Sequence, residues 1–200
     1  MSLTVTFPHY QDLIALKWQL DHYVGFPTEI LKCLHFFIVD DGSKDFVSVY
    51  QLVSHYIPFL SIRLFQIMQD IPFNMPLANN IVIRFATTQH ILRTDIDHVI
   101  PLKTIKYVLK ELNTMNMKTY GVFSRKSLEE GTYIQPHMNT HVINKELYKL
   151  MRGYDEAYSG HYGHDDSDFL WRLQASGVTS LSLPPAYYIW QRRKIGRAHV

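Results

Sequence analysis

Segments with the pattern of buried strands alternate with segments that have the spacing of amphipathic helices over the first half of the chain. The run at 34–39 is apolar except for one histidine, as expected of a strand covered on both faces. Asp12 can cap a helix whose apolar residues follow at helical spacing. Such alternation predicts an α/β fold with a mostly parallel central sheet flanked by helices and a Rossmann-like N-terminal half. The expected strands are 3–7, 34–39, 61–66 and 91–94, and the expected helices are 13–23, 46–56 and 78–87.

The second half of the chain continues with less regular segments. A polar stretch at 125–133 is typical of a loop, and the acidic, glycine-containing stretch at 159–168 is typical of a flexible segment that leads into a helix. The expected helices here are 101–112, 145–151 and 168–175, and the expected strands are 119–123, 141–143 and 178–183.

Two acidic pairs follow strands of the predicted sheet. Asp40 and Asp41 end the second strand, and Asp95 and Asp97 follow the fourth. Ligands bind beyond the carboxyl ends of the strands in sheets of this kind. Alternate residues of an extended segment point the same way, so Asp95 and Asp97 can together hold a hard cation such as Mg²⁺ or Mn²⁺. His98 follows them and is a candidate further ligand or a support for one.

Composition narrows the class of protein. The 200 residues suit one domain, and 46% hydrophobic with 19% charged residues is typical of a globular chain. A net charge of +2 with dispersed Lys and Arg argues against a nucleic-acid partner. A single cysteine, Cys33, excludes an internal disulfide and fits a reducing compartment. With no apolar run of about 18 residues and no signal-peptide pattern, we expect a cytoplasmic protein without a transmembrane segment.

The last residues differ from the rest. Residues 195–200 have no apolar period and resemble translated adapter sequence, so we expect a non-native tail after a domain that covers 1–194.

Motifs in five places, taken in chain order, resemble one enzyme family. They are Pro8-x-Tyr10 (followed by Gln11 where Asn is usual); Val39-Asp40-Asp41-Gly42-Ser43; Ala78-Asn79-Asn80 with Ala86; Asp95-Ile96-Asp97; and Gly153-Tyr154-Asp155-Glu156 followed by Gly163-His164-Asp165-Asp166-Ser167-Asp168 and Arg172-Leu173. Together they resemble nucleotide-sugar-dependent glycosyltransferases of the GT-A fold, nearest to the inverting family two.

The resemblance implies a donor site in the half 1–98. Asp41, with Asp40 beside it, would accept a hydrogen bond from the nucleobase. Asp95 would contact the ribose or support the metal, and Asp97 would bind the Mn²⁺ or Mg²⁺ that bridges the diphosphate. The family motifs also place Pro8, Tyr10 and Asn80 at the nucleotide sugar.

The resemblance implies an acceptor and catalytic half at 99–194. Asp166 would deprotonate the acceptor hydroxyl, because inverting transfer needs a carboxylate within reach of that proton. Asp165 stands beside it, where the family more often has Glu. Asp168 and Arg172 lie four residues apart on one helix, so we expect a structural ion pair. The family's later metal-binding histidine has no counterpart at 187–191.

The predicted function is therefore metal-assisted transfer of a sugar from a nucleoside diphosphate sugar to a glycan or other hydroxyl acceptor, with inversion. One alternative is a degenerate domain that binds the sugar nucleotide without turnover. Another is a metallohydrolase in which His161, His164 and Asp165 join Asp97 at a transition metal.

Overall fold

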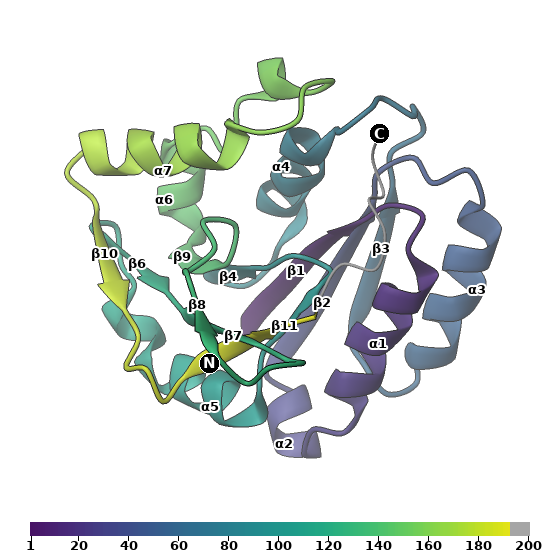
Figure 1. Cartoon of the computed structure of the whole chain (residues 1–200), viewed down its shortest axis with the longest axis horizontal. Helices are drawn as coiled ribbons and strands as arrows, with labels where there is room; N and C mark the ends of the chain where they lie inside the picture. The colour runs from purple at the N-terminus through teal and green to yellow at the C-terminus, as the bar shows by residue number, and fades with distance from the viewer. Residues whose placement is uncertain (193–200) are drawn as a thin grey trace.

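The computed structural model describes residues 1–192, and the predicted tail at 195–200 lies outside them. Its larger sheet has seven strands (Figure 1). β9 pairs antiparallel with both of its neighbours, and the other paired strands of this sheet run parallel. The spatial order is β10 (Thr179–Ser182), β6 (Thr119–Val122), β9 (His141–Asn144), β4 (His90–Arg93), β1 (Leu3–His9), β2 (Leu34–Asp40) and β3 (Ile62–Gln66).

Helices cover both faces of this sheet, as predicted (Figure 1). One apolar core joins the sheet to α1 (Leu13–Val24), α3 (Phe46–Tyr56) and α5 (Leu102–Glu111). A second core on the opposite face joins it to α4 (Met75–Phe85), α6 (Lys145–Leu150) and α7 (Asp165–Ala175). The short helices are α2 (Thr28–Leu31) and the 3-10 turns η1 (Leu112–Thr114) and η2 (Glu156–Tyr158). Within residues 1–192 no helix is long and apolar enough to cross a membrane.

A second, four-stranded sheet corrects the prediction of a loop at 125–133. Its order is β5 (His98–Val99), β11 (Tyr188–Gln191), β7 (Ser124–Ser127) and β8 (Tyr133–Ile134). β7 and β8 form a hairpin, and β7 also pairs in parallel with β11. The polar composition of β7 gave no strand pattern in the sequence, and its parallel partner β11 lies more than sixty residues further along the chain.

Two helix boundaries also differ from the prediction. α7 begins at Asp165 rather than 168, so Asp165 and Asp166 lie in its first turn, where acidic side chains are favoured by the helix dipole. α4 begins at Met75 rather than 78, after the N-cap residue Asn74, and carries Pro76 in its first turn.

The carboxyl ends of β4, β1 and β2 meet at one edge of the larger sheet. In the register of the parallel pairs, His9 of β1 lies opposite Asp40 of β2, and Thr6 of β1 lies opposite Arg93 of β4. The two predicted acidic pairs therefore lie at the same edge, on either side of the end of β1.

Candidate functional site

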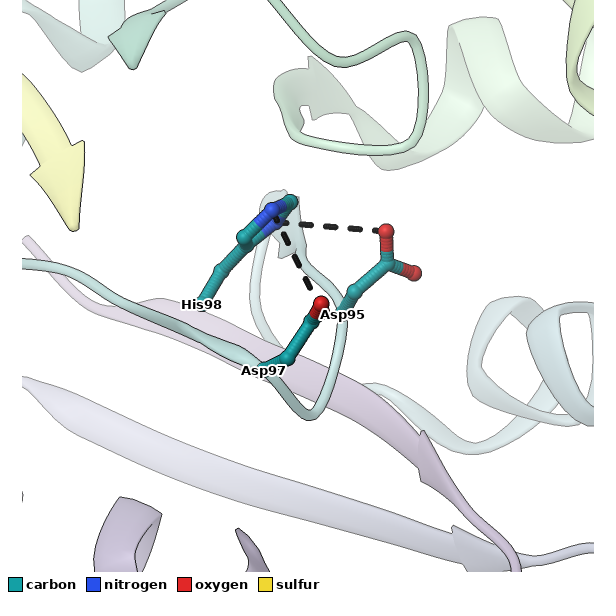
Figure 2. A group of neighbouring side chains, drawn as sticks. All are labelled: Asp95, Asp97 and His98. Atoms are coloured by element: carbon teal, nitrogen blue, oxygen red, sulfur yellow. Dashed lines mark ion pairs between the residues drawn. The ribbon is translucent and has the colours of Figure 1, made fainter. Parts of the chain in front are cut away.

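A compact group of three side chains lies in the turn after β4 and at the first residue of β5. Figure 2 shows the His98 ring turned toward the carboxylates of Asp95 and Asp97. His98 Nδ1 lies 3.9 Å from Asp95 Oδ2, and His98 Nε2 lies 4.0 Å from Asp97 Oδ1. One ligand atom from each residue can be chosen so that all lie within 4.8 Å of one another. Two carboxylates and an imidazole are a suitable donor set for Mn²⁺.

The burial and hydrogen bonding of His98 suit a neutral metal ligand. Its side chain is 1% exposed, and burial lowers its pKa to about 4, so the ring is uncharged at neutral pH. Nδ1 lies 2.9 Å from Thr140 Oγ1, whereas the buried Nε2 has no hydrogen-bond partner in the described part of the chain. A ring that donates from Nδ1 to Thr140 directs the lone pair of Nε2 toward Asp97. This unpartnered nitrogen supports the fit of a cation.

Asp95 is held by a buried arginine. Arg93 is fully buried, and its Nη1 donates to Asp95 Oδ1 at 2.6 Å and to the carbonyl of Asn139 at 2.7 Å. Its Nε donates to Asn79 Oδ1 at 3.0 Å, and His137 Nδ1 lies 3.1 Å from Asp95 Oδ2. Burial alone would raise the pKa of Asp95, but the charge of Arg93 and the contact with His137 hold it well below its usual range.

Asp97 has weaker partners than Asp95. Among residues 1–192, the side chain that donates to Asp97 is Gln191 of β11, whose Nε2 lies 3.4 Å from Oδ2. Both oxygens of Asp95 are engaged by Arg93 and His137, so Asp97 is the carboxylate with more capacity left for a cation. Gln191 belongs to the stretch 187–191, where the sequence offers no histidine.

The turn that carries the group is fixed from α1. Gln19 is completely buried, and its Nε2 donates to the carbonyls of Asp95 and Ile96 at 3.1 Å each and also to the carbonyl of His98. One buried amide thus contacts three carbonyls of this segment, and the Asp95 carbonyl also accepts from the backbone N–H of His98 at 3.1 Å.

The two acidic residues at the end of β2, Asp40 and Asp41, have different hydrogen-bond environments. Both oxygens of Asp40 are bonded, Oδ2 with His9 Nδ1 at 2.7 Å and Oδ1 with the backbone N–H of Ser43 at 2.8 Å. Asp41 accepts from the backbone N–H of Asn74 at 3.0 Å through Oδ2, and its buried Oδ1 has no hydrogen-bond partner among the described residues. Burial raises the pKa of Asp41 to about 7. Asp41 therefore keeps one acceptor oxygen unpaired within residues 1–192, whereas both oxygens of Asp40 are bonded.

The other predicted donor-site residues lie in different settings. Pro8 is buried in β1 opposite Val39. Tyr10 Oη donates to Asp70 Oδ1 at 3.2 Å, and burial together with Asp70 raises its pKa. Asn80 bonds through its amide to the backbone N–H and carbonyl of Tyr154 and to Glu156 Oε1. Asn80 thereby fixes the turn at 153–156, and its contact with a nucleotide sugar stays a prediction.

The predicted catalytic pair lies at the start of α7. Asp165 is 2% exposed, and its Oδ2 has no partner in the described part of the chain. Burial, and next the charge of Asp166, raises the pKa of Asp165. Asp166 is half-buried and accepts from the backbone N–H of Ser167 at 2.7 Å. The predicted structural pair is present, with Arg172 Nε 2.8 Å from Asp168 Oδ2.

The histidines of the hydrolase alternative do not join a metal-binding group. Within residues 1–192, the one group of three or more potential ligands is Asp95, Asp97 and His98. His161 and His164 therefore give that alternative no cation centre in this structure.

Sequence reasoning missed Arg93, Gln19 and His137. A charged residue inside an apolar strand was a visible signal for Arg93, and a polar residue at an apolar position of a helix was one for Gln19. His137 follows a proline in an irregular segment and carried no signal.

Comparison with solved structures identifies the fold. The chain superposes on S. aureus TarS 1–349 in complex with UDP-GlcNAc with a TM-score of 0.81 and 16% identity, covering 98% of this chain and 60% of that one. For the mannosyltransferase PcManGT of Pyrobaculum calidifontis, in complex with GDP-Man and Mn²⁺, the TM-score is 0.69 at 18% identity. The match covers 98% of this chain and 57% of that one. For GalNAc-T7 with UDP, GalNAc and Mn²⁺, the TM-score is 0.70 at 11% identity, and the match covers 97% of this chain and 44% of that one.

These matches confirm the prediction of a GT-A glycosyltransferase fold over nearly the whole chain. The chain spans 60% or less of the length of these three proteins. No protein-family model matches the chain, and no curated protein sequence is significantly similar to it.

Proposed function

We propose that this chain is a glycosyltransferase domain that transfers a sugar from a nucleoside diphosphate sugar to a hydroxyl acceptor with inversion. The observation that carries this proposal is the group Asp95, Asp97 and His98 at the carboxyl edge of a GT-A sheet. Asp41, whose Oδ1 has no hydrogen-bond partner within residues 1–192, lies at the same edge. Structures with this fold include one with UDP-GlcNAc and one with GDP-Man and Mn²⁺.

The donor would bind in the half 1–98. Asp97 and His98 would hold Mn²⁺ or Mg²⁺, which offsets the negative charge of the departing nucleoside diphosphate as a Lewis acid. Asp95, held by Arg93 and His137, would support this site and contact the ribose. Asp41 would accept from a donor group of the nucleobase through Oδ1.

The acceptor would bind in the half 99–194, with Asp166 as the base. Asp166 is half-buried, so it remains accessible to a hydroxyl group. Buried Asp165 lies directly beside it in the first turn of α7.

The test is release of the nucleoside diphosphate from a panel of UDP- and GDP-sugars, with acceptor sugars added, in Mn²⁺ and in EDTA. We expect release in Mn²⁺, loss in EDTA, and loss in Asp97→Ala and Asp166→Ala. Glu146→Ala removes an exposed carboxylate of α6 and should leave the rate unchanged. Absence of nucleotide-sugar binding in Mn²⁺ would refute the proposal, and binding without turnover would favour the degenerate domain.

A further inference from the structure

One arginine of the smaller sheet faces the candidate metal site. Arg125 of β7 lies opposite Ile189 of β11, which is completely buried. Paired residues of neighbouring strands point to the same side, and so do residues two apart on one strand. Arg125 therefore shares a face with Gln191, whose Nε2 lies 3.4 Å from Asp97 Oδ2. β7, which was not predicted from the sequence, therefore directs the Arg125 side chain toward the carboxylates of the candidate metal site.

The contacts of Arg125 fix its direction and leave most of its guanidinium available. Nε donates to the carbonyl of Gln135 at 2.7 Å, at the start of the segment that carries His137 to Asp95. Within residues 1–192, no carboxylate forms an ion pair with Arg125 at 4.0 Å or less. Burial lowers the pKa of the Arg125 guanidinium, and the charges of Asp97 and Asp95 oppose that shift.

This arrangement places a second positive group beside a cation site. A guanidinium and a divalent cation repel each other unless an anion lies between them. The half-buried position of Arg125 strengthens that repulsion relative to open solvent. A diphosphate can satisfy both, because a guanidinium binds phosphate oxygens through paired N–H groups.

We propose that Arg125 binds the phosphate groups of the nucleoside diphosphate beside the cation site of Asp97 and His98. This inference rests on the proposed function. Arg125 holds the leaving group through its charge, whereas Asp41 at the other end of the donor holds the base.

The experiment measures affinity by calorimetry for UDP, GDP and uridine in Mn²⁺, and affinity for Mn²⁺ alone by electron paramagnetic resonance. In Arg125→Gln we expect UDP or GDP to bind about 10- to 100-fold more weakly, the usual effect of losing a charged hydrogen bond. Uridine affinity should be unchanged, and Mn²⁺ alone should bind equally or more tightly. Arg125→Lys, which keeps the charge, should recover part of the UDP affinity.

Lys126 supplies a matched control on the same strand. Its side chain lies on the opposite face, with Nζ 4.3 Å from the ring centre of Tyr133 and 4.5 Å from that of Tyr188. Lys126→Gln removes the same charge and should leave UDP and Mn²⁺ affinity unchanged. Equal weakening by both variants would show a general charge effect and overturn the proposal.

The remaining outcomes separate this inference from the proposed function. If UDP or GDP binds the parent and Arg125→Gln binds it equally well, or if Arg125→Gln also weakens Mn²⁺ binding, the inference fails while the proposed function stands. If neither nucleotide binds the parent, the proposed function fails, and inorganic pyrophosphate with Mn²⁺ becomes the probe. Weaker pyrophosphate binding in Arg125→Gln then supports the role of Arg125, and equal or absent binding overturns it.

Discussion

The replacement Asp41→Asn should stabilise the ligand-free protein at alkaline pH. Asp41 is 2% exposed, and its pKa is raised from 3.8 to about 7 by burial. The folded protein therefore holds a proton that the unfolded chain releases, so stability is full below about pH 4 and falls as pH rises to about 7. A shift of this size corresponds to about 4 kcal/mol at about 1.4 kcal/mol per unit. Because relaxation of the surroundings reduces the cost of burying a charge, we expect about 2 kcal/mol.

The assay is urea unfolding of the parent and Asp41→Asn at pH 4, 6 and 8. The variant should gain about 2 kcal/mol over the parent at pH 8 and little at pH 4. Asp40→Asn is the matched control, because both Asp40 oxygens are already bonded, and it should destabilise the protein. A difference between Asp41→Asn and the parent that does not change with pH would refute the reasoning.

The same variant should bind nucleotide more weakly. The backbone N–H of Asn74 requires an acceptor, so the new amide would place its oxygen there and its NH₂ group toward the base. Loss of the charged acceptor should weaken UDP or GDP binding about 10- to 100-fold. An increase in folding stability together with weaker nucleotide binding would indicate that the carboxylate of Asp41 contributes to ligand binding and not to folding.

Three further variants test how the site is supported. Arg93→Met leaves the partly buried Asp95 without its cation and should destabilise the protein by about 3–5 kcal/mol in urea unfolding. The double variant with Asp95→Asn should recover part of this loss, and no recovery would contradict the pairing. Gln19→Leu removes the amide that binds the segment 95–98, so we expect folding stability to fall by about 1–3 kcal/mol. Mn²⁺ should also bind more weakly, as measured by paramagnetic resonance. Unchanged Mn²⁺ affinity would count against this role of Gln19. Gly153→Ala adds a methyl group that would overlap Asn80 Oδ1, at a φ of +65°, so its melting temperature should fall well below that of the parent. An equal melting temperature would disprove the tight contact.

The parts of the fold that could be predicted are those that depend on neighbours in sequence. The order of strands and helices over the first half follows from local periodicity, and it places Asp41 and Asp97 at one edge of a sheet. The strand β7 could not be recognised, because its polar residues have no alternating apolar pattern and one of its two partners, β11, is distant in sequence. The start of α7 was placed three residues late because the acidic residues there were assigned to the preceding loop.

The candidate site shows the same division between local and distant information. The spacing of Asp95, Asp97 and His98 is local, and the structure brings these three together. Besides Asp95, Arg93 donates to Asn79, 14 residues earlier, and to Asn139, 46 residues later, and no pattern in the strand reveals these two distant partners. The environment that locks Asp95 and leaves Asp97 available therefore emerges only from tertiary packing.

The most direct test of the central claim is calorimetric titration of UDP and of GDP into the parent and into Asp97→Ala, each in Mn²⁺ and in EDTA. We predict that the parent binds one of these nucleotides in Mn²⁺, that EDTA abolishes the binding, and that Asp97→Ala binds weakly in both conditions. Binding that is equal with and without the cation, or no binding of either nucleotide to the folded parent in Mn²⁺, would contradict a metal-assisted nucleotide-sugar site at this edge of the sheet.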